Sequence, residues 1–312
     1  MNDPAARPID AIRAMLTTLL GGPDASIEHR RAQAAAFAAS QPPPPPGLRI
    51  TPITLGGVSA EAIEVETIEV ETGGRAAHVL HLHGGGYVMG DPAGSRGFTT
   101  ALARATRARV VSLDYRLAPA HPFPAAVEDA LAAYAGLLDS GVPAPRIAIA
   151  GESAGGGLVV ATLLAIRDAG LPTPAAAVAM SPWADMACTG ASYATRAARD
   201  PMLTRRILLE MAGQYLSGQD PGSPLASPAG ADLTGLPPLL IQVGDDEVLL
   251  DDAIALAQRA RDAGVRVELE VWPDMIHVWQ MFAGALPQAD EAIARIAGFL
   301  WGTPGWTRDA TP

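Results

Sequence analysis

The stretch "RIAIAGESAGGGLVVATLL", residues 146–164, combines a short aliphatic strand, a tight turn and an apolar helix. The turn carries the pattern G-x-S-x-G at residues 151–155, which places a serine where a strand ends and a helix begins. Glycine on both sides permits so tight a turn. We therefore predict that Ser153 is a nucleophile held on a strand-to-helix elbow. The alternative is a turn that binds phosphate at the helix N-terminus without covalent chemistry.

Strand and helix patterns alternate on both sides of this turn. Short aliphatic runs stand at 78–83, 108–115, 147–150, 175–181, 238–244 and 267–272. Helical patterns stand at 94–106, 125–138, 154–169, 252–263 and 288–300. Before them, "ITPITL" (50–55) and "EAIEVETIEVE" (61–71) alternate apolar and polar residues. The sequence thus predicts an α/β fold, with a mostly parallel sheet that opens with an antiparallel pair and carries helices on both faces.

Two segments fall outside this alternation. Residues 1–46 hold two helical patterns, the second with Ser26 as N-cap, and end in the proline run of "QPPPPPG". Residues 184–235 fit no strand and read as helix followed by a Gly/Pro/Ser-rich loop. An insertion between strands usually lies above the carboxyl edge of the sheet, where ligands bind. The remaining residues, 47–183 and 236–312, form the predicted main domain.

Composition excludes several classes of protein. Hydrophobic residues make up 49% and charged residues 18% of the 312 residues, which is typical of a globular chain. The net charge of −11 argues against nucleic acid and anionic lipid as partners. Cys188 is the single cysteine, so no intramolecular disulfide can form. We find no signal peptide or membrane-spanning stretch in the sequence and expect a cytoplasmic protein.

A serine hydroxyl needs a base near neutral pH. In folds built around this elbow the chain order is serine, acid, histidine. Of the six histidines only His277 follows Ser153, and it lies just after the last strand pattern. We predict His277 to be the base. The acid is expected after the strand at 238–244, where Asp245, Asp246 and Glu247 are all candidates.

The loop "HGGG", residues 83–86, ends the strand at 78–83. Three successive glycines let backbone N–H groups converge on one point, as an oxyanion hole requires. The competing interpretation takes His81 and His83 as metal ligands, but the sequence supplies no cysteine cluster to complete such a site.

Together these motifs resemble the hormone-sensitive-lipase-like family of α/β-hydrolases, the bacterial family IV esterases. The resemblance spans about residues 75–300 and rests on "HGGG", "DYRLAPAHPFPAA" (114–126), "GESAGG" (151–156), "SPW" (181–183), "VGDDEVLLDD" (243–252) and "DMIHVW" (274–279). It implies an eight-stranded α/β-hydrolase sheet under a helical cap made from residues 1–46 and 184–235. It also implies that Gly85, Gly86 and Ala154 donate the oxyanion N–H groups and that His83 is structural.

Two positions depart from the family pattern. Glu152 replaces the usual aspartate of the elbow, and we expect little effect because the side chain points away from the substrate. Ala120 replaces a usual glutamate, which we expect to remove a buried structural contact.

The family pattern D-P-L-x-D also bears on the acid. Only Glu247 has a second acid four residues later, at Asp251, so ungapped matching favours Glu247, with Asp246 and Asp245 as alternatives. Asp251 and Asp252 are expected to cap the next helix and complement its dipole. Oxygen ligands at alternate positions are missing across residues 248–250, which argues against a calcium loop.

The resemblance implies a serine carboxylesterase that hydrolyses short- to medium-chain esters, with no cofactor or metal. Its expected partners are a small-molecule ester and, as in many family members, a second copy of the chain. An amidase, peptidase or acyltransferase using the same triad is the alternative, and a non-catalytic receptor of the gibberellin-receptor kind, which lacks the histidine, is the more distant one. Six residues are candidates for an apolar substrate pocket: Tyr87, Trp183, Tyr193, Leu208, Met211 and Trp279.

Overall fold

One eight-stranded sheet organises the chain in the computed structural model, which describes residues 7–22, 25–41, 43–66 and 76–306. The strand order is β1-β2-β4-β3-β5-β6-β7-β8. The antiparallel pairs are β1 with β2 and β2 with β4, and every later pairing is parallel. The strands are β1 (Leu48–Leu55), β2 (Val58–Val65), β3 (His78–Leu82), β4 (Arg109–Leu113), β5 (Ile147–Glu152), β6 (Ala176–Met180), β7 (Leu239–Gly244) and β8 (Val267–Trp272).

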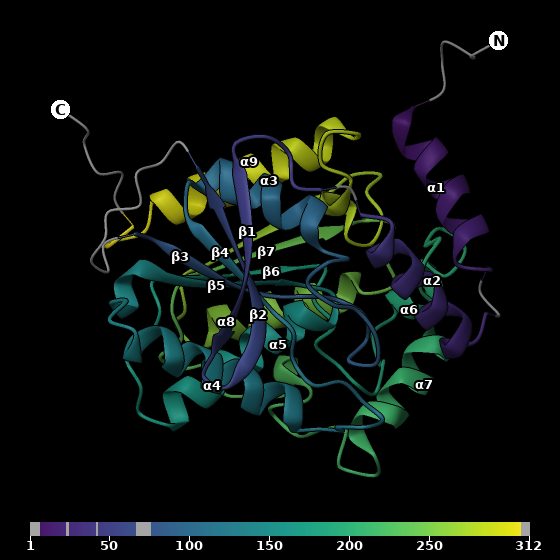
Figure 1. Cartoon of the computed structure of the whole chain (residues 1–312). Helices are drawn as coiled ribbons and strands as arrows, with labels where there is room; N and C mark the ends of the chain where they lie inside the picture. Colours follow the sequence, from purple (N-terminus) through teal and green to yellow (C-terminus); the bar gives the residue numbers. More distant parts are fainter. Residues whose placement is uncertain (1–6, 23–24, 42, 67–75, 307–312) are drawn as a thin grey trace.

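Helices cover both faces of this sheet (Figure 1). One face carries α3 (Arg96–Thr106) and α9 (Pro287–Trp301), and the other carries α4 (Ala125–Asp139), α5 (Ala154–Asp168) and α8 (Leu250–Asp262). Strand side chains alternate between the two cores: in β5, Ile147 and Ile149 pack toward α4 and α5, while Ala148 and Ala150 pack toward α3 and α9. Because both faces are buried, the central strands are mostly apolar, and the polar residues that they carry, such as His81, have hydrogen-bond partners within the protein.

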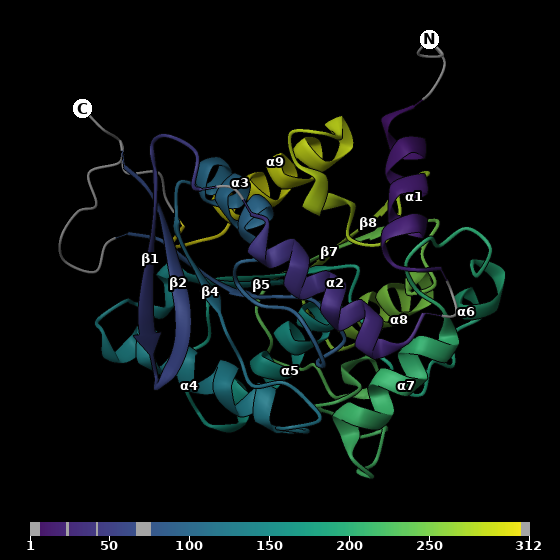
Figure 2. The same cartoon turned by 45° about the vertical axis from the view of Figure 1, so that its right-hand side comes forward.

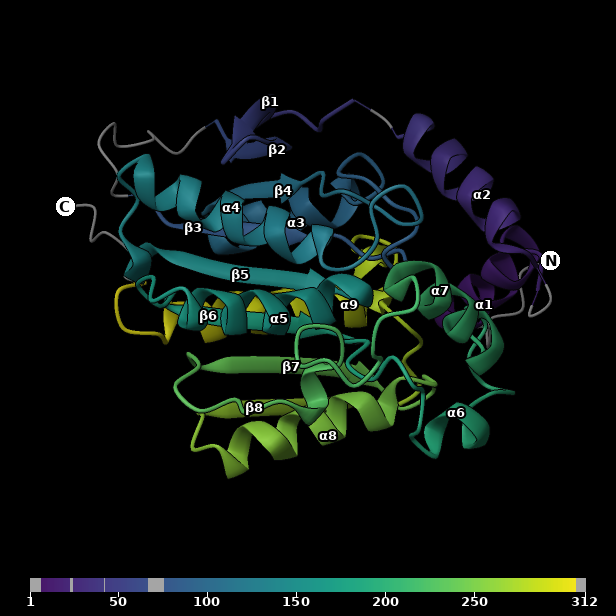
Figure 3. The ribbon, with the colours of Figure 1, turned by 90° about the horizontal axis from the view of Figure 1, so that it is seen from below.

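Four further helices gather beyond the carboxyl ends of the parallel strands (Figures 2 and 3). They are α1 (Pro8–Leu19) and α2 (Ile27–Ala39) from the N-terminal segment, and α6 (Ser192–Thr195) and α7 (Arg205–Leu216) from the insertion. Short 3-10 turns lie at Ala144–Arg146, Pro228–Gly230 and Trp279–Phe282. The two segments set apart in the sequence are therefore neighbours in space.

Helix α1 rests on the chain around His277. Its stripe of Ile9, Ile12 and Leu16 is buried in one cluster with Met275, Ile276 and Trp279, and with residues of α9. Burying such side chains stabilises the contact by about 1.5–3 kcal/mol each. The N-terminal helix is thus fixed directly against the loop that bears the predicted base.

The α/β architecture, the antiparallel opening pair and the eight strands are confirmed. Ser26 caps α2, as predicted, by accepting a hydrogen bond from the His29 N–H at 3.2 Å. Residues 67–71 of the second expected strand and Pro42 of the proline run lie outside the described residues. Over the ranges that the structure describes, no helix has the length and apolar character needed to cross a membrane.

Candidate active site

Ser153 stands between β5 and α5 with φ 57° and ψ −121°, a left-handed conformation that non-glycine residues rarely adopt. The flanking glycines are required by space. A Cβ on Gly151 would lie 2.6 Å from the Leu82 carbonyl oxygen, and one on Gly155 only 2.0 Å from it. Close packing of the elbow against the end of β3 therefore excludes any larger residue, and the strained serine is held in place.

Ser153, His277 and Glu247 form one hydrogen-bonded chain. The Ser153 Oγ lies 2.8 Å from His277 Nε2, and His277 Nδ1 lies 2.8 Å from Glu247 Oε2. The serine comes from the elbow, the acid from the loop after β7 and the histidine from the loop after β8. Both distances suit proton transfer from serine to imidazole with a carboxylate that orients the ring.

Glu247 is completely buried, and two further donors hold its carboxylate. Its Oε1 accepts hydrogen bonds from the Gly244 N–H at 2.6 Å and the Ser181 hydroxyl at 2.7 Å. The Ser181 Oγ in turn accepts the Val278 N–H at 3.2 Å, next to the histidine. Ser181 thus links the acid and histidine loops. Sequence reasoning did not single it out, although it is the serine of the "SPW" motif.

The two carboxylates before Glu247 have other partners. Asp245 accepts a hydrogen bond from the Asp274 N–H at 2.8 Å. Asp246 is buried and forms ion pairs with Arg13 of α1 and Arg199 of the insertion. The structure therefore brings neither Asp245 nor Asp246 to His277, and it brings Glu247 there.

Asp251 and Asp252 correct the expectation that they cap α8. The helix has Leu249 at its N-cap, with no side-chain cap. Asp251 instead accepts the Ser192 N–H at 2.9 Å. Asp252 accepts two backbone N–H groups of the insertion and the Tyr193 hydroxyl. Burial outweighs these bonds and raises the pKa of Asp252 to about 7. Both residues lie in the first turn of α8 and join the insertion to that helix.

The glycine loop lies directly beside Ser153. A Cβ on Gly84 would be 3.3 Å from the Ser153 Cβ. Gly85 and Gly86 have φ of 117° and 65°, and among the described residues no acceptor takes their N–H groups. The Ala154 N–H opens α5 and has no partner within the helix. These N–H groups lie on both sides of Ser153 and have no acceptor among the described residues, which leaves them available as hydrogen-bond donors.

Glu152 forms hydrogen bonds that join the elbow to the glycine loop and to His81 of β3. Its Oε1 accepts the Gly84 N–H at 2.7 Å, and its Oε2 lies 2.8 Å from His81 Nε2. His81 Nδ1 lies 2.9 Å from the Ser112 hydroxyl, so both ring nitrogens have partners within the protein and neither is left for a metal. Glu152 therefore fastens the glycine loop to the elbow, and the expected small effect of glutamate in place of aspartate stays a prediction.

His83 holds the same loop from the other side. Its Nδ1 donates to the Gly84 carbonyl at 2.7 Å, and its ring stacks on Tyr115 with centroids 4.2 Å apart. The Tyr115 hydroxyl donates to the His83 carbonyl at 2.7 Å. Burial lowers the pKa of His83, which keeps the ring neutral. These contacts give His83 a structural position, as expected.

A cavity of about 490 Å³ opens onto Ser153 and His277. Its lining is mainly apolar and comes from α1, α2, the insertion and the loop after β8. Leu208 and Met211 of α7 line it, as predicted. Leu16, Phe37, Met202 and Leu203 also line it, and sequence reasoning missed them because nothing local marks which face of a helix meets the cavity.

The other four pocket candidates do not line this cavity, and that prediction is corrected. Tyr87 and Trp183 are fully buried in the main core, where Tyr87 stacks on Tyr215. Tyr193 bonds Asp252, and Trp279 packs under α1. Large aromatic side chains fill cores as readily as pockets, and all four of these aromatic residues are buried in hydrophobic cores. Ala120 is exposed, and the loss of a buried contact at that position stays a prediction.

Comparisons with known proteins agree with this geometry. Residues 79–281 match the model of a family described as having the alpha/beta hydrolase fold. The chain is 52% identical to an acetyl-hydrolase of Streptomyces hygroscopicus, over 80% of this chain and 81% of that protein. It is 34% identical to an esterase of Acinetobacter venetianus, over 81% and 82% of the two chains.

A solved structure of an esterase from the bacterial hormone-sensitive lipase family is also similar. It superposes with a TM-score of 0.87 at 46% identity and covers 96% of this chain and 98% of that one.

Proposed function

Since the chain belongs to the α/β-hydrolase family, within its hormone-sensitive-lipase branch of carboxylic ester hydrolases, we propose that Ser153, His277 and Glu247 are its catalytic triad. The observation that carries the proposal is the hydrogen-bonded chain of the three side chains, with 2.8 Å at each step. It supports an ester hydrolase that works through an acyl-enzyme.

The reaction follows from this arrangement. His277 Nε2 takes the hydroxyl proton as the Ser153 Oγ attacks the ester carbonyl. The carbonyl oxygen becomes an oxyanion, which the N–H groups of Gly85, Gly86 and Ala154 stabilise. His277 then gives its proton to the leaving alcohol. Water, deprotonated by the same nitrogen, attacks the acyl-serine. The bond from the acyl carbon to the Ser153 Oγ then breaks, His277 returns the proton to that oxygen, and the carboxylic acid is released. Glu247 holds the ring orientation and balances the imidazolium charge throughout.

The substrate is a small ester with a short or medium acyl chain. The apolar lining of the cavity suits an uncharged hydrocarbon group, and its volume of about 490 Å³ suits a small molecule. Residues 1–46 and 184–235 act together as a cap that completes this cavity, since both segments contribute to its lining. We retain the cytoplasmic location and a homodimer as predictions.

A comparison of p-nitrophenyl acetate, butyrate and decanoate tests the proposal. We expect turnover of the first two, and rapid covalent labelling of Ser153 by a fluorophosphonate. Ser153→Ala should abolish both. An unlabelled protein without turnover would favour a receptor. Faster cleavage of an anilide than of the matched ester would favour an amidase, and an ester product in water–alcohol mixtures would favour an acyltransferase.

A further inference from the structure

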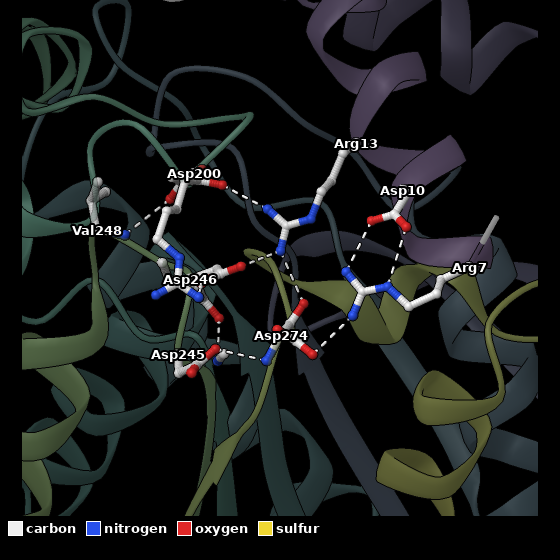
Figure 4. Close-up of polar contacts among 11 residues, drawn as sticks. Arg7, Asp10, Arg13, Asp200, Asp245, Asp246, Val248 and Asp274 are labelled. Atoms are coloured by element: carbon white, nitrogen blue, oxygen red, sulfur yellow. Dashed lines mark hydrogen bonds and ion pairs between the residues drawn. The ribbon is translucent and has the colours of Figure 1, made fainter. Parts of the chain in front are cut away.

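Arg13 of α1 contacts three segments of the chain that meet at the triad (Figure 4). Its Nη2 donates to the Asp246 carboxylate and to the Asp274 carbonyl, the latter at 3.0 Å. Its Nη1 donates to the Arg199 carbonyl at 2.7 Å. Asp246 precedes Glu247, Asp274 belongs to the loop of His277, and Arg199 belongs to the insertion. One guanidinium therefore joins the acid loop, the histidine loop and the second part of the cap.

The acid and histidine loops already touch at their backbones. The Asp246 N–H donates to the Met275 carbonyl at 3.2 Å, and the Asp245 carboxylate accepts the Asp274 N–H at 2.8 Å. Arg13 closes this contact from the cap side. Because the guanidinium is planar and presents several donors in fixed directions, it sets the spacing of its three acceptors.

The insertion holds the acid from both neighbouring positions. Arg199 forms an ion pair with Asp246, the residue immediately before Glu247. The Asp200 carboxylate accepts the Val248 N–H at 3.0 Å, immediately after it. The same Asp200 accepts the N–H groups of Met202 and Leu203 at 2.8 and 2.9 Å, and both of those residues line the substrate cavity. The wall of the cavity and the acid loop are thus one hydrogen-bonded unit.

We propose that Arg13 is a positioning residue, which together with Asp246 sets the Glu247–His277 geometry and makes that geometry depend on a seated cap. The inference rests on the proposed triad. Anchoring of α1 does not require Arg13, because Ile9, Ile12 and Leu16 already bury that helix. The contacts of Arg13 lie instead on the two loops that carry the acid and the base and on the insertion. A cap that lifts would release Asp246 and loosen Glu247.

The primary test is Arg13→Gln, with kcat and KM measured on p-nitrophenyl acetate. We expect kcat to fall roughly 10- to 100-fold, since a misplacement of about 1 Å costs up to 10² in rate. KM should change less than about threefold, because Arg13 does not line the substrate cavity. Arg7→Gln is the matched control. Arg7 also pairs with Asp274, but it is exposed and does not touch Asp246, so its kcat should stay within twofold of wild type.

Chemical rescue separates positioning from simple loss of stability. Arg13→Ala should regain kcat with millimolar methylguanidinium, at concentrations that leave wild type and Arg7→Ala unchanged. If Arg13→Ala does not fold, Asp246→Asn keeps the shape of the loop and should show the same fall in kcat at constant KM. The proposal is overturned if Arg13→Gln or Asp246→Asn keeps the wild-type kcat. It is also overturned if Arg13→Ala has a lowered melting temperature and methylguanidinium does not restore its kcat. Ser153→Ala, run in parallel, reports on the triad alone.

Discussion

Replacing Glu247 by glutamine tests the acid by exchanging one carboxylate oxygen for an NH₂ group. The wild-type carboxylate accepts three hydrogen bonds, from His277 Nδ1, the Gly244 N–H and the Ser181 hydroxyl. An amide has one acceptor oxygen and one donor group. If its oxygen faces Gly244 and Ser181, its NH₂ faces His277 and fixes the tautomer whose Nε2 carries the proton. That ring cannot accept the Ser153 proton.

The opposite orientation keeps the correct tautomer but places the NH₂ group against the Gly244 N–H. In the wild type, Glu247 Oε1 stands at that place and accepts the Gly244 N–H at 2.6 Å. An unsatisfied buried donor costs about 1–3 kcal/mol, so this active orientation is disfavoured roughly 5- to 160-fold. Loss of the negative charge beside the imidazolium comes in addition. The equivalent change in another serine triad lowers kcat about 10⁴-fold, which corresponds to about 5.4 kcal/mol.

The assay is kcat for p-nitrophenyl acetate, with circular dichroism to verify folding. We expect a fall of about 10⁴ in Glu247→Gln. Asp245→Asn is the control, since its amide oxygen can still accept the Asp274 N–H, and kcat should stay within about threefold. The reasoning is refuted if Glu247→Gln keeps more than a tenth of wild-type kcat, or if Asp245→Asn shows the larger loss.

Three other predictions concern the surroundings of the triad. In Gly85→Ala the new Cβ would lie 2.1 Å from the Met89 carbonyl oxygen, so an oxyanion donor must move and kcat should fall at least about 100-fold. Gly141→Ala, also at positive φ but with free space, should lower stability by about 1 kcal/mol with kcat unchanged, and equal losses of kcat would contradict this. Glu152→Ala leaves the Gly84 N–H and His81 without their partner, so urea unfolding should show a loss of about 2–4 kcal/mol in the free energy of unfolding. A urea midpoint equal to that of wild type would disprove this. Folding raises the pKa of Asp252 from 3.8 to about 7, so its contribution to stability is present below pH 4 and lost as pH rises to 7; the stability of wild type relative to Asp252→Asn should therefore fall by a few kcal/mol from pH 4 to 8, and a constant difference would refute the assignment.

The sequence predicted those parts of the site that depend on local order. Ser153 is marked by a turn whose glycines touch the neighbouring strand, and His277 by its place after the last strand. Glu247 was favoured over Asp246 and Asp245 because it alone fits the family pattern D-P-L-x-D, with Asp251 four residues later. Its supporting contact to Ser181 joins residues 66 apart in the chain, and no local pattern reports such a pairing.

The pocket was predicted less well, for a physical reason. Leu208 and Met211 lie on the face of α7 that meets the cavity, while Tyr87 and Trp183 are equally apolar and lie in the core. Hydrophobicity states that a side chain leaves water but not which apolar space it enters. Sequence reasoning missed Arg13 for a different reason: its three acceptors lie 186 to 261 residues away along the chain, and no local pattern reports such contacts.

The cost of burying three carboxylates after β7 is offset in three different ways. Glu247 accepts three hydrogen bonds, Asp246 pairs with two arginines, and Asp252 combines hydrogen bonds with a raised pKa. A buried carboxylate must use one of these means, because an uncompensated charge costs several kcal/mol. The partners of Asp246 and Asp252 come from the cap segments. Glu247 depends instead on Gly244 at the end of β7, on Ser181 just after β6 and on the histidine loop. The acid loop therefore reaches its native charge balance only when the cap segments are in place, which connects formation of the substrate cavity to formation of the triad.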